Sequence, residues 1–340
     1  MINATKGANL LTHIFTFITS KWGKWFTVTT WLIGSIILIM AAPVLKESTQ
    51  ATDWLPNSAE STKAFNISVE QFPQPGLPVI IVIRNTNGLS ASDYTQARNI
   101  DTWLKTNNIN AFYDKQKLEE NEIENFIQKI KQQKIAGANV TVPFKKKVIP
   151  FLDKLSFEAE KTQSVNTIVF ENNNLVGHNT DVIGFTRAIK DLNFNIKGSK
   201  IFILGAGGVV PSIIFALNKM EVSQITISNR TKEKAENLKK IYKDLEIVNW
   251  GEIVEFDMII NCTSLGLKNT DEIKINYNNI GINKLFFDLI YNPKETNFLK
   301  KAKLTGNKTE NGKMMFIYQA QLAFKIWHDI LPKVTENLLN

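Results

Sequence analysis

KIFILGAGGVVPSIIFALNKMEVSQITISNRT, residues 200–231, carries the most informative pattern in this chain. The apolar run at 200–204 is typical of a buried strand, and the turn Gly205-Ala206-Gly207-Gly208 follows it directly. The pattern then predicts a helix over 210–219 and a second strand over 225–228. A strand, a glycine-rich turn and a helix in this order predict a nucleotide-binding unit on a parallel α/β sheet.

The glycine-rich turn fits the phosphates of a dinucleotide. Gly205 permits a tight turn, and Gly207 lets the backbone approach a pyrophosphate group. The N-terminus of the following helix offers N–H groups and a partial positive charge to the phosphates. Val210 stands where the usual fingerprint has a third small residue, so a glycine turn that holds no ligand is the alternative.

The end of the second strand indicates the cofactor. An NAD site would place Asp or Glu there for the ribose 2′-hydroxyl. This chain has Asn229-Arg230-Thr231, with Lys234 one turn into the next helix. Cations and hydrogen-bond donors suit a 2′-phosphate, which arginine can bind through two hydrogen bonds. The sequence therefore predicts NADP, although Asn229 or Thr231 could also cap the helix.

Length and composition limit the class of protein. The 340 residues are enough for about two domains, and 44% hydrophobic residues allow a substantial buried core. Cys262 is the only cysteine, which excludes an intramolecular disulfide and a zinc site built on paired cysteines. The three histidines lack ligand spacing, so we expect no metal site. The net charge of +8 comes without a basic block rich in aromatics, so we expect no nucleic-acid partner.

An uncharged segment of 21 residues lies near the N-terminus, at 25–45. As a helix it is long enough to cross a hydrocarbon core of about 30 Å. Lys21 and Lys24 precede it, which predicts a cytoplasmic N-terminus with the rest of the chain outside. We expect an uncleaved transmembrane anchor; a cleaved signal peptide is the alternative, but its apolar stretch would be shorter.

The residues after this segment resemble a transporter. TDWLPNSAESTKAF (52–65) and QFPQPGLPVIIVIRNTNGLSASDYTQA (71–97) are similar to the start of an MMPL-type exporter of the resistance-nodulation-division superfamily. The resemblance covers about residues 1–105. A complete exporter is excluded, because such proteins need many more spans and intramembrane acids than this chain has.

Alternating strands and helices begin after about residue 103. The pattern predicts a strand over 109–118, a helix over 121–133 and a strand over 135–143. Polar motifs recur at or near the ends of such elements: NVTVPFK (139–145), SVNT (164–167), GHNTD (177–181), NCTSLG (261–266) and DLIYNP (288–293), followed by Gly312 and Gln319.

In order and spacing these motifs resemble shikimate dehydrogenases over about residues 103–340. The resemblance implies NADP-dependent interconversion of shikimate and 3-dehydroshikimate, on the route to chorismate and the aromatic amino acids. A quinate dehydrogenase of the same superfamily is an alternative that differs in substrate.

The resemblance also implies the roles of residues. Lys145 and Asp181 match the catalytic pair, in which the lysine exchanges the hydroxyl proton and the aspartate holds the ammonium. Taken alone, Lys145 could belong to a solvated lysine run, and Asn179 and Asp181 could cap the helix that follows. Substrate-binding positions are matched by Thr141, Asn166, Tyr291 and Gln319. Cofactor-binding positions are matched by Gly205, Ala206, Gly207, Gly208, Val209, Asn229, Arg230, Thr231, Lys234, Thr263, Leu289 and Gly312.

One family motif is missing. Shikimate dehydrogenases begin with a strand and an S-x-S-x-S-P loop whose hydroxyls bind the substrate carboxylate, and this chain has no such loop. The exporter-like segment supplies a strand (78–84) and a helix (92–105) in the same order, with Ser90 and Ser92 between or beside them. These serines could replace the missing hydroxyls; a helix capping box of Ser90 with Asp93 is the alternative.

We therefore expect a two-lobed α/β enzyme behind one transmembrane helix. A membrane-anchor segment covers 1–66, and a substrate lobe of parallel strands covers 67–185, exporter-like to 105 and dehydrogenase-like from 106. A Rossmann lobe covers 186–311, and a C-terminal helix within 312–340 packs back on the substrate lobe. The resemblance implies a cytoplasmic enzyme, whereas the anchor directs it outside. We hypothesise a chimera of two reading frames, which could bind NADP and yet be catalytically impaired.

Overall fold

The computed structural model describes residues 79–82 and 91–335, together with Ser20, Trp22, Trp25, Thr29 and Leu338. Most of the predicted transmembrane segment 25–45 lies outside these residues, as do the exporter-like motif at 52–65 and Ser90. In the described part of the chain, no helix combines the length and the apolar character needed to span a bilayer. Residues 72–340 form one compact unit.

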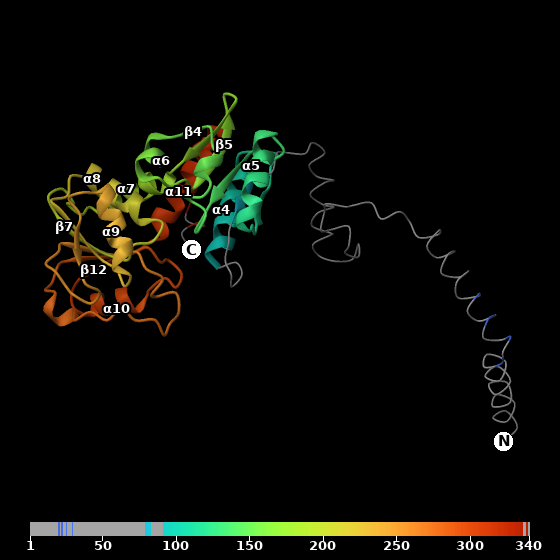
Figure 1. Cartoon of the computed structure of the whole chain (residues 1–340). Coiled ribbons are helices and arrows are strands. Elements are labelled where there is room, and N and C mark those ends of the chain that lie inside the picture. The colour runs from blue at the N-terminus through green and yellow to red at the C-terminus, as the bar shows by residue number, and fades with distance from the viewer. Residues whose placement is uncertain are drawn as a thin grey trace, which may run out of the picture. The chain divides into compact units, whose positions relative to one another are not determined.

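The first of two six-stranded sheets has the order β2-β1-β3-β5-β6-β4, and Figure 1 labels its strands β4 and β5. Its strands are β1 (Val79–Val82), β2 (Tyr113–Gln116), β3 (Gly137–Val140), β4 (Lys154–Leu155), β5 (Thr167–Glu171) and β6 (Asn174–His178). The helices of this lobe are α4 (Ala91–Thr106), α5 (Ile123–Lys131) and α6 (Phe157–Thr162).

Strand β1 comes from the exporter-like segment and lies inside this sheet. It pairs in parallel with two neighbours, so that Val79 is opposite Tyr113 of β2 and Gly137 of β3. The helix α4 follows, close to the predicted range 92–105. The segment therefore provides the first strand and helix of the lobe, and removing β1 would separate β2 from the rest of the sheet.

The expectation of a sheet built from parallel strands is wrong for part of this lobe. Strand β5 runs antiparallel to both β3 and β6. A tight turn at Asn172 and Asn173, with positive φ angles of 48° and 61°, joins β5 to β6. Antiparallel strands can be joined by two residues, whereas parallel neighbours need a long crossover.

The apolar face of α5 holds this lobe together. Ile123, Phe126, Ile127 and Ile130 recur at helical spacing and are all buried. They pack with Val140, Ile168 and other apolar residues of the sheet. The predicted helix 121–133 is shorter in the structure, because its first turn is a 3-10 helix at Glu120–Glu122.

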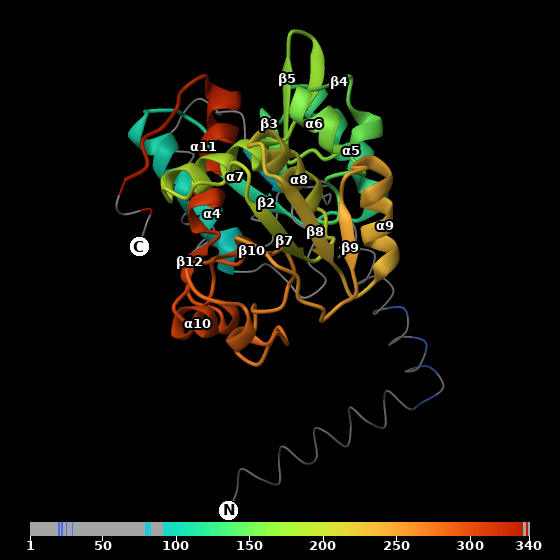
Figure 2. The same ribbon diagram turned by 90° about the vertical axis from the view of Figure 1, so that its left-hand side faces the viewer.

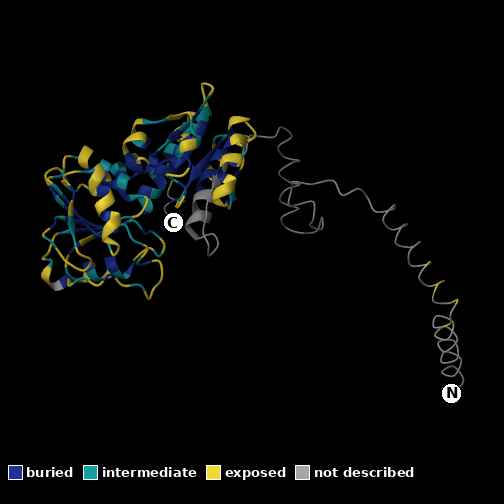
Figure 3. Ribbon diagram, in the orientation of Figure 1, coloured by how far each residue is buried: buried dark blue, intermediate teal, exposed yellow. Residues whose placement is uncertain are grey.

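The second sheet is entirely parallel and has the order β12-β11-β10-β7-β8-β9 (Figure 2). Its strands are β7 (Lys200–Leu204), β8 (Gln224–Ser228), β9 (Glu246–Val248), β10 (Met258–Asn261), β11 (Leu285–Asp288) and β12 (Lys308–Asn311). The helices α7 (Thr180–Asp191), α8 (Val210–Lys219), α9 (Lys232–Ile241) and α10 (Asn297–Leu304) accompany it. Buried residues concentrate on the strands β3, β7, β8, β10 and β11 (Figure 3).

The last long helix, α11 (Lys313–His328), packs against both α7 and α4. Its Phe324 ring meets Trp103 of α4 edge to face at 5.8 Å. Trp327 Nε1 donates a hydrogen bond to the carbonyl of Ile168 in β5, at 3.2 Å. The C-terminal helix thus contacts α4 and β5 of the first lobe.

Candidate active site

Two oppositely charged side chains meet where the motifs NVTVPFK and GHNTD come together. Lys145 Nζ lies 2.6 Å from Asp181 Oδ2. The exposed fractions of the two side chains are 14% and 8%. A close pair that is largely shielded from water interacts more strongly than a surface ion pair.

Local packing separates Lys145 from the two lysines that follow it. Strand β3 ends at Val140, and the turn that follows buries Phe144 completely. The carbonyl of Lys145 accepts a hydrogen bond from the N–H of Val165 at 2.8 Å. Lys146 and Lys147 are exposed, so only the first lysine of the run lies in the site.

Asp181 sits in the first turn of α7. Asn179 is the N-cap of this helix, and its side chain accepts a hydrogen bond from the Asp181 N–H at 3.1 Å. The positive end of the helix dipole favours a carboxylate at this position. The capping alternative of the sequence analysis therefore applies to Asn179, while the carboxylate of Asp181 is turned to Lys145.

The amide of Asn166 links several polar residues of the site. Its Nδ2 donates to Thr180 Oγ1 at 2.9 Å and to Asp181 Oδ1 at 3.0 Å. Gln319 Oε1, from α11, lies at 3.5 Å from the same nitrogen. All four residues are buried. The structure thus brings together three separate motifs around the Lys145–Asp181 pair.

A second layer of polar residues lies behind Asn166 and was not predicted from the sequence. Tyr113 Oη donates to Asn139 Oδ1 at 2.6 Å, and Asn139 Nδ2 donates to the carbonyl of Asn166 at 3.1 Å. Asn139 opens the NVTVPFK motif, so its presence near the site was available from the sequence. Nothing in the sequence pattern pairs it with Tyr113, which lies 26 residues away.

The other residues predicted to bind the substrate lie on different elements of the fold. Thr141 directly follows β3 and is partly buried. The Tyr291 ring stacks on Phe316 of α11 with ring centroids 4.5 Å apart. Ser92 lies in the first turn of α4, and Ser90 is outside the described residues, so their predicted role stays a prediction.

The glycine-rich turn between β7 and α8 fits a dinucleotide phosphate group. Gly205 has a φ of 103°, and a Cβ there would lie 2.9 Å from Thr263 Cγ2. At Gly207 the nearest heavy atom to such a Cβ is Cys262 O, at 3.8 Å. The backbone at Gly207 is therefore open to a close ligand, while Gly205 makes the turn possible.

The turn after β8 is tied to this glycine loop. Asn229 Oδ1 accepts a hydrogen bond from the Ala206 N–H at 3.0 Å, and its Nδ2 donates to Thr231 O at 2.7 Å. Arg230, Thr231 and Lys234 are exposed beside it. Two cations thus stand at the end of the second strand, where a 2′-phosphate would need them.

The ends of β10 and β11 hold a buried polar cluster. Asn261 Nδ2 donates to Asp288 Oδ1 at 3.0 Å, and Thr263 Oγ1 donates to Asn261 Oδ1 at 2.7 Å. Burial raises the pKa of Asp288 to about 6 and also raises the pKa of the Cys262 thiol, which argues against a nucleophilic cysteine. Leu289 follows β11, and Gly312 N–H donates to Ile290 O at 3.3 Å, so these two candidates are neighbours.

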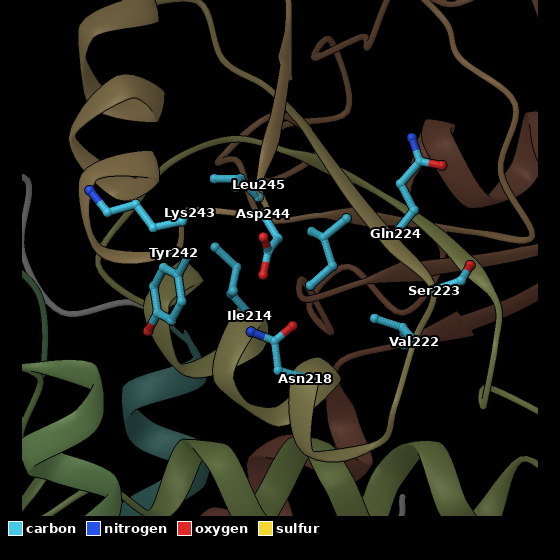
Figure 4. A pocket seen from close by; sticks show the side chains of 10 residues that line it. Ile214, Asn218, Val222, Ser223, Gln224, Tyr242, Lys243, Asp244 and Leu245 are labelled. Carbon is cyan, nitrogen blue, oxygen red and sulfur yellow. The ribbon is translucent and has the colours of Figure 1, made fainter.

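The glycine loop of one sheet faces the NVTVPFK loop of the other. A Cβ placed on Gly208 would lie 3.5 Å from Val142 Cγ2. The candidate cofactor loop and the Lys145 loop therefore meet at the carboxyl ends of their strands, as expected for ligand sites in α/β folds. A pocket of about 230 Å³ lined by Ile214, Gln224, Tyr242 and Leu245 lies at the opposite ends of β8 and β9 (Figure 4) and is a separate feature.

Comparisons with known proteins match the same regions. The family model "Shikimate dehydrogenase substrate binding domain" matches residues 97–168, and "Shikimate / quinate 5-dehydrogenase" matches residues 187–296. The NADP(+) shikimate dehydrogenase of Pelagibacter ubique is 56% identical over 238 residues, which are 70% of this chain and 90% of that protein. That of Caldicellulosiruptor saccharolyticus is 39% identical over 66% of this chain and 84% of that protein.

Solved structures agree in fold. Shikimate dehydrogenase from Aquifex aeolicus superposes with a TM-score of 0.69 and 36% identity, covering 78% of this chain and 96% of that one. The Thermus thermophilus enzyme, solved with NADP(H) and shikimate, has a TM-score of 0.67 and 26% identity over 76% of this chain and 95% of that one.

The comparisons also correct one boundary. The substrate-domain model begins at residue 97, whereas the sequence motifs predict a start near 103 and an exporter-like segment up to about 105. Most of α4 thus belongs with the dehydrogenase. The match to the Pelagibacter ubique protein, the family models and the shared fold together show that this chain belongs to the shikimate dehydrogenase family.

Proposed function

We propose that this chain is an NADP-dependent shikimate dehydrogenase that interconverts shikimate and 3-dehydroshikimate. The observation that carries this function is the shielded Lys145–Asp181 pair, with 2.6 Å between Nζ and Oδ2. The pair lies beside the Asn166 amide and close to the glycine loop of the second sheet.

The cofactor would be held by residues around the glycine-rich turn. Gly205, Ala206, Gly207, Gly208 and Val209, with the start of α8, would bind the pyrophosphate. Asn229, Arg230, Thr231 and Lys234 would bind the 2′-phosphate, and Thr263, Leu289 and Gly312 would border the nicotinamide. When bound, NADPH supplies the hydride for the substrate carbonyl carbon, and NADP⁺ accepts it in the reverse direction.

Lys145 would supply the proton that the hydride transfer requires. In the direction of reduction, the Lys145 Nζ ammonium donates one proton to the carbonyl oxygen, which becomes the hydroxyl of shikimate. The Asp181 carboxylate holds the ammonium at a fixed place and balances its charge. In the direction of oxidation, the neutral amine of Lys145 accepts the proton from the same hydroxyl.

The other polar residues would orient the substrate. Thr141, Asn166, Tyr291 and Gln319 can offer hydrogen bonds to several hydroxyls at once, which favours a polyhydroxylated ring. For Asn166 and Gln319 this is supported by their burial and by their place next to Asp181. Ser90 and Ser92 are proposed for the substrate carboxylate, from their position in the sequence after β1, just before and within the first turn of α4.

The N-terminal part carries a separate proposal. We infer that β1 and α4 act as the first strand and helix of the substrate lobe, supported by the parallel pairing of β1 with β2 and β3. The transmembrane helix 25–45, the exporter resemblance and the joining of two reading frames stay predictions. We propose a cytoplasmic location, because the proposed cofactor is NADPH. Membrane attachment is supported only by the predicted helix 25–45. Continuous long sequencing reads through residues 95–115 would contradict misassembly.

The function is tested by following NADPH formation with the purified full chain, NADP⁺ and shikimate. We expect turnover that depends on both substrates, and quinate in place of shikimate tests the second substrate that the family model names. NADP⁺ binding without turnover would instead support the catalytically impaired alternative, in which the substrate-carboxylate site is incomplete.

A further inference from the structure

Asn179 occupies a junction of three helices. It is the N-cap of α7, with φ of −122° and ψ of 94°, and only 2% of it is exposed. Its Oδ1 accepts the N–H of Asp181 at 3.1 Å. Its position two residues before Asp181 and the geometry of this bond fix the first turn of α7, from which the Asp181 carboxylate reaches Lys145.

The other end of the same amide bonds to two further helices. Asn179 Nδ2 donates to Thr162 Oγ1 at the end of α6 and to Ser212 Oγ in α8, both at 2.8 Å. Thr162 and Ser212 are themselves buried. Both amide hydrogens and the amide oxygen are thus used, and only a side-chain amide offers two donors and an acceptor in this arrangement.

The hydrogen bond from Asn179 to Ser212 links this junction to the proposed cofactor site. Helix α8 begins at Val210, directly after the Gly205–Gly208 turn, so Ser212 lies in the first turn of the helix proposed to bind the cofactor phosphates. One buried side chain therefore connects the backbone that carries Asp181 to the element that holds the cofactor. Capping of α7 needs only the hydrogen bond that Asn179 Oδ1 accepts from the Asp181 N–H, and it does not require a bond to α8.

We propose that Asn179 is a positioning residue that holds the Lys145–Asp181 pair in register with the cofactor-binding end of α8. The inference rests on the proposed function for its effect on turnover. Hydride and proton must reach one carbonyl group together, so the two parts of the site must keep a fixed relative position. Misplacement by about 1 Å can cost about 100-fold in rate.

The test uses variants that separate capping from linkage. Asn179→Ser retains a hydroxyl that can cap α7 but is too short to reach both α6 and α8. Ser212→Ala leaves Asn179 and its cap in place and removes the link to α8 alone. Ser156→Ala is the matched control, because it removes the side-chain cap of α6, in which Ser156 Oγ accepts from Ala159 N at 3.3 Å, and leaves the side chains that bond to Asn179 unchanged.

Two measurements on the full chain test whether Asn179 has this positioning role. In wild type and Ser156→Ala, we expect NADP⁺ binding to slow hydrogen exchange at the first turn of α7; in Asn179→Ser and Ser212→Ala we expect this protection to be lost. For those two variants we also expect kcat to fall about tenfold while KM for shikimate stays within about twofold of wild type, in keeping with lost alignment. If Asn179→Ser does not fold, Ser212→Ala carries the test.

The results keep this inference separate from the proposed function. Wild-type turnover of shikimate tests the function, whereas the exchange measurement needs only NADP⁺ binding. Unchanged protection of α7 in Ser212→Ala would overturn the link. Lost protection with kcat within twofold of wild type would overturn the positioning role and leave Asn179 as a structural cap.

Discussion

Lys145 and Asp181 lie 36 residues apart in the sequence, yet their side chains meet at 2.6 Å between Nζ and Oδ2. Lys145 follows a strand of the first sheet, and Asp181 opens the helix α7. The fold places a cation and an anion together in a region with little access to water. Removing either partner leaves the other without its counter-charge in this region, which is costly.

Lys145→Ala removes the proposed proton donor. We expect kcat for shikimate oxidation to fall by about 100- to 10,000-fold, the usual contribution of a positioned acid or base. NADP⁺ binding, followed by quenching of protein fluorescence, remains at wild-type strength because Lys145 is not a proposed cofactor ligand. The control is Lys146→Ala, which removes the exposed neighbouring lysine; a loss of turnover in both variants would contradict the assignment.

Asp181→Asn retains the shape of the side chain and removes its charge. The variant loses the charge-assisted hydrogen bond to Lys145, which contributes about 1.5–3 kcal/mol, so we expect kcat to fall by about 10- to 100-fold. Asp191→Asn, at the other end of α7 where the carboxylate bonds to Tyr318 Oη, is the matched control. Steady-state rates with shikimate check both variants, and a kcat within twofold of wild type for Asp181→Asn would exclude an essential role of its charge.

Asp288 predicts a pH dependence of stability. Burial raises its pKa to about 6 in the folded chain from the ordinary value of 3.8 for an aspartate. Between about pH 4 and pH 6 the folded state therefore binds more protons than the unfolded state, so the free energy of unfolding falls as pH rises. The stabilising contribution is present in full below about pH 4 and is lost above about pH 6.

The variant Asp288→Asn isolates this effect. Its amide can still accept from Asn261 and Ile290, which bond to Oδ1 in the wild type, and it does not titrate. The difference in unfolding free energy, wild type minus variant, is expected to fall by about 2 kcal/mol between pH 4 and pH 7. Urea unfolding at the two pH values measures it, and a constant difference would show that Asp288 does not titrate in this range.

The sequence predicts the second sheet well, because its signals are local. The strand at 200–204 and the helix at 210–219 have the bounds of β7 and α8. An apolar run, a glycine turn and a helix of ordinary length specify these elements without help from distant residues. The strand predicted at 78–84 was also found, as β1, although its surrounding sequence resembles another family.

The sequence did not predict other features, of which one is a local turn and the others are contacts between distant residues. The turn of the β5–β6 hairpin is formed by Asn172 and Asn173, which have positive φ angles. Asparagine tolerates such angles, but this residue pair was not recognised as a turn signal in the sequence. The Tyr113–Asn139 hydrogen bond and the threefold bonding of Asn179 join different motifs. The sequence could place Asn179 at a helix start, but it could not show that α8 passes beside it.

Arg230→Ala tests the choice of cofactor. If Arg230 binds the 2′-phosphate, losing this contact raises KM for NADP⁺ by about 10- to 100-fold, as for one strong charged hydrogen bond. KM for NAD⁺, which lacks that phosphate, is expected to stay the same. Lys239→Ala removes an exposed cation from the last turn of α9 and serves as the control. Equal effects of Arg230→Ala on both cofactors would contradict 2′-phosphate recognition.

Gly205→Ala and Gly207→Ala separate the two uses of glycine in the phosphate loop. Gly205 has a φ of 103°, and an added Cβ would meet Thr263 Cγ2 at 2.9 Å and the Cys262 carbonyl carbon at 3.0 Å. We expect Gly205→Ala to lower the free energy of unfolding by about 2 kcal/mol. The same methyl group on Gly207 meets no heavy atom nearer than 3.8 Å, so the melting temperature of Gly207→Ala is expected to match wild type.

NADP⁺ binding is expected to be impaired in Gly207→Ala, whereas the loss of stability is expected in Gly205→Ala. The methyl group of Gly207→Ala would occupy the space through which a pyrophosphate approaches the backbone, so we expect KM for NADP⁺ to rise at least about tenfold. Thermal unfolding together with NADP⁺ kinetics checks both variants. Wild-type NADP⁺ binding by Gly207→Ala would show that the phosphates do not pass this residue, and the cofactor site would then have to lie elsewhere on the loop.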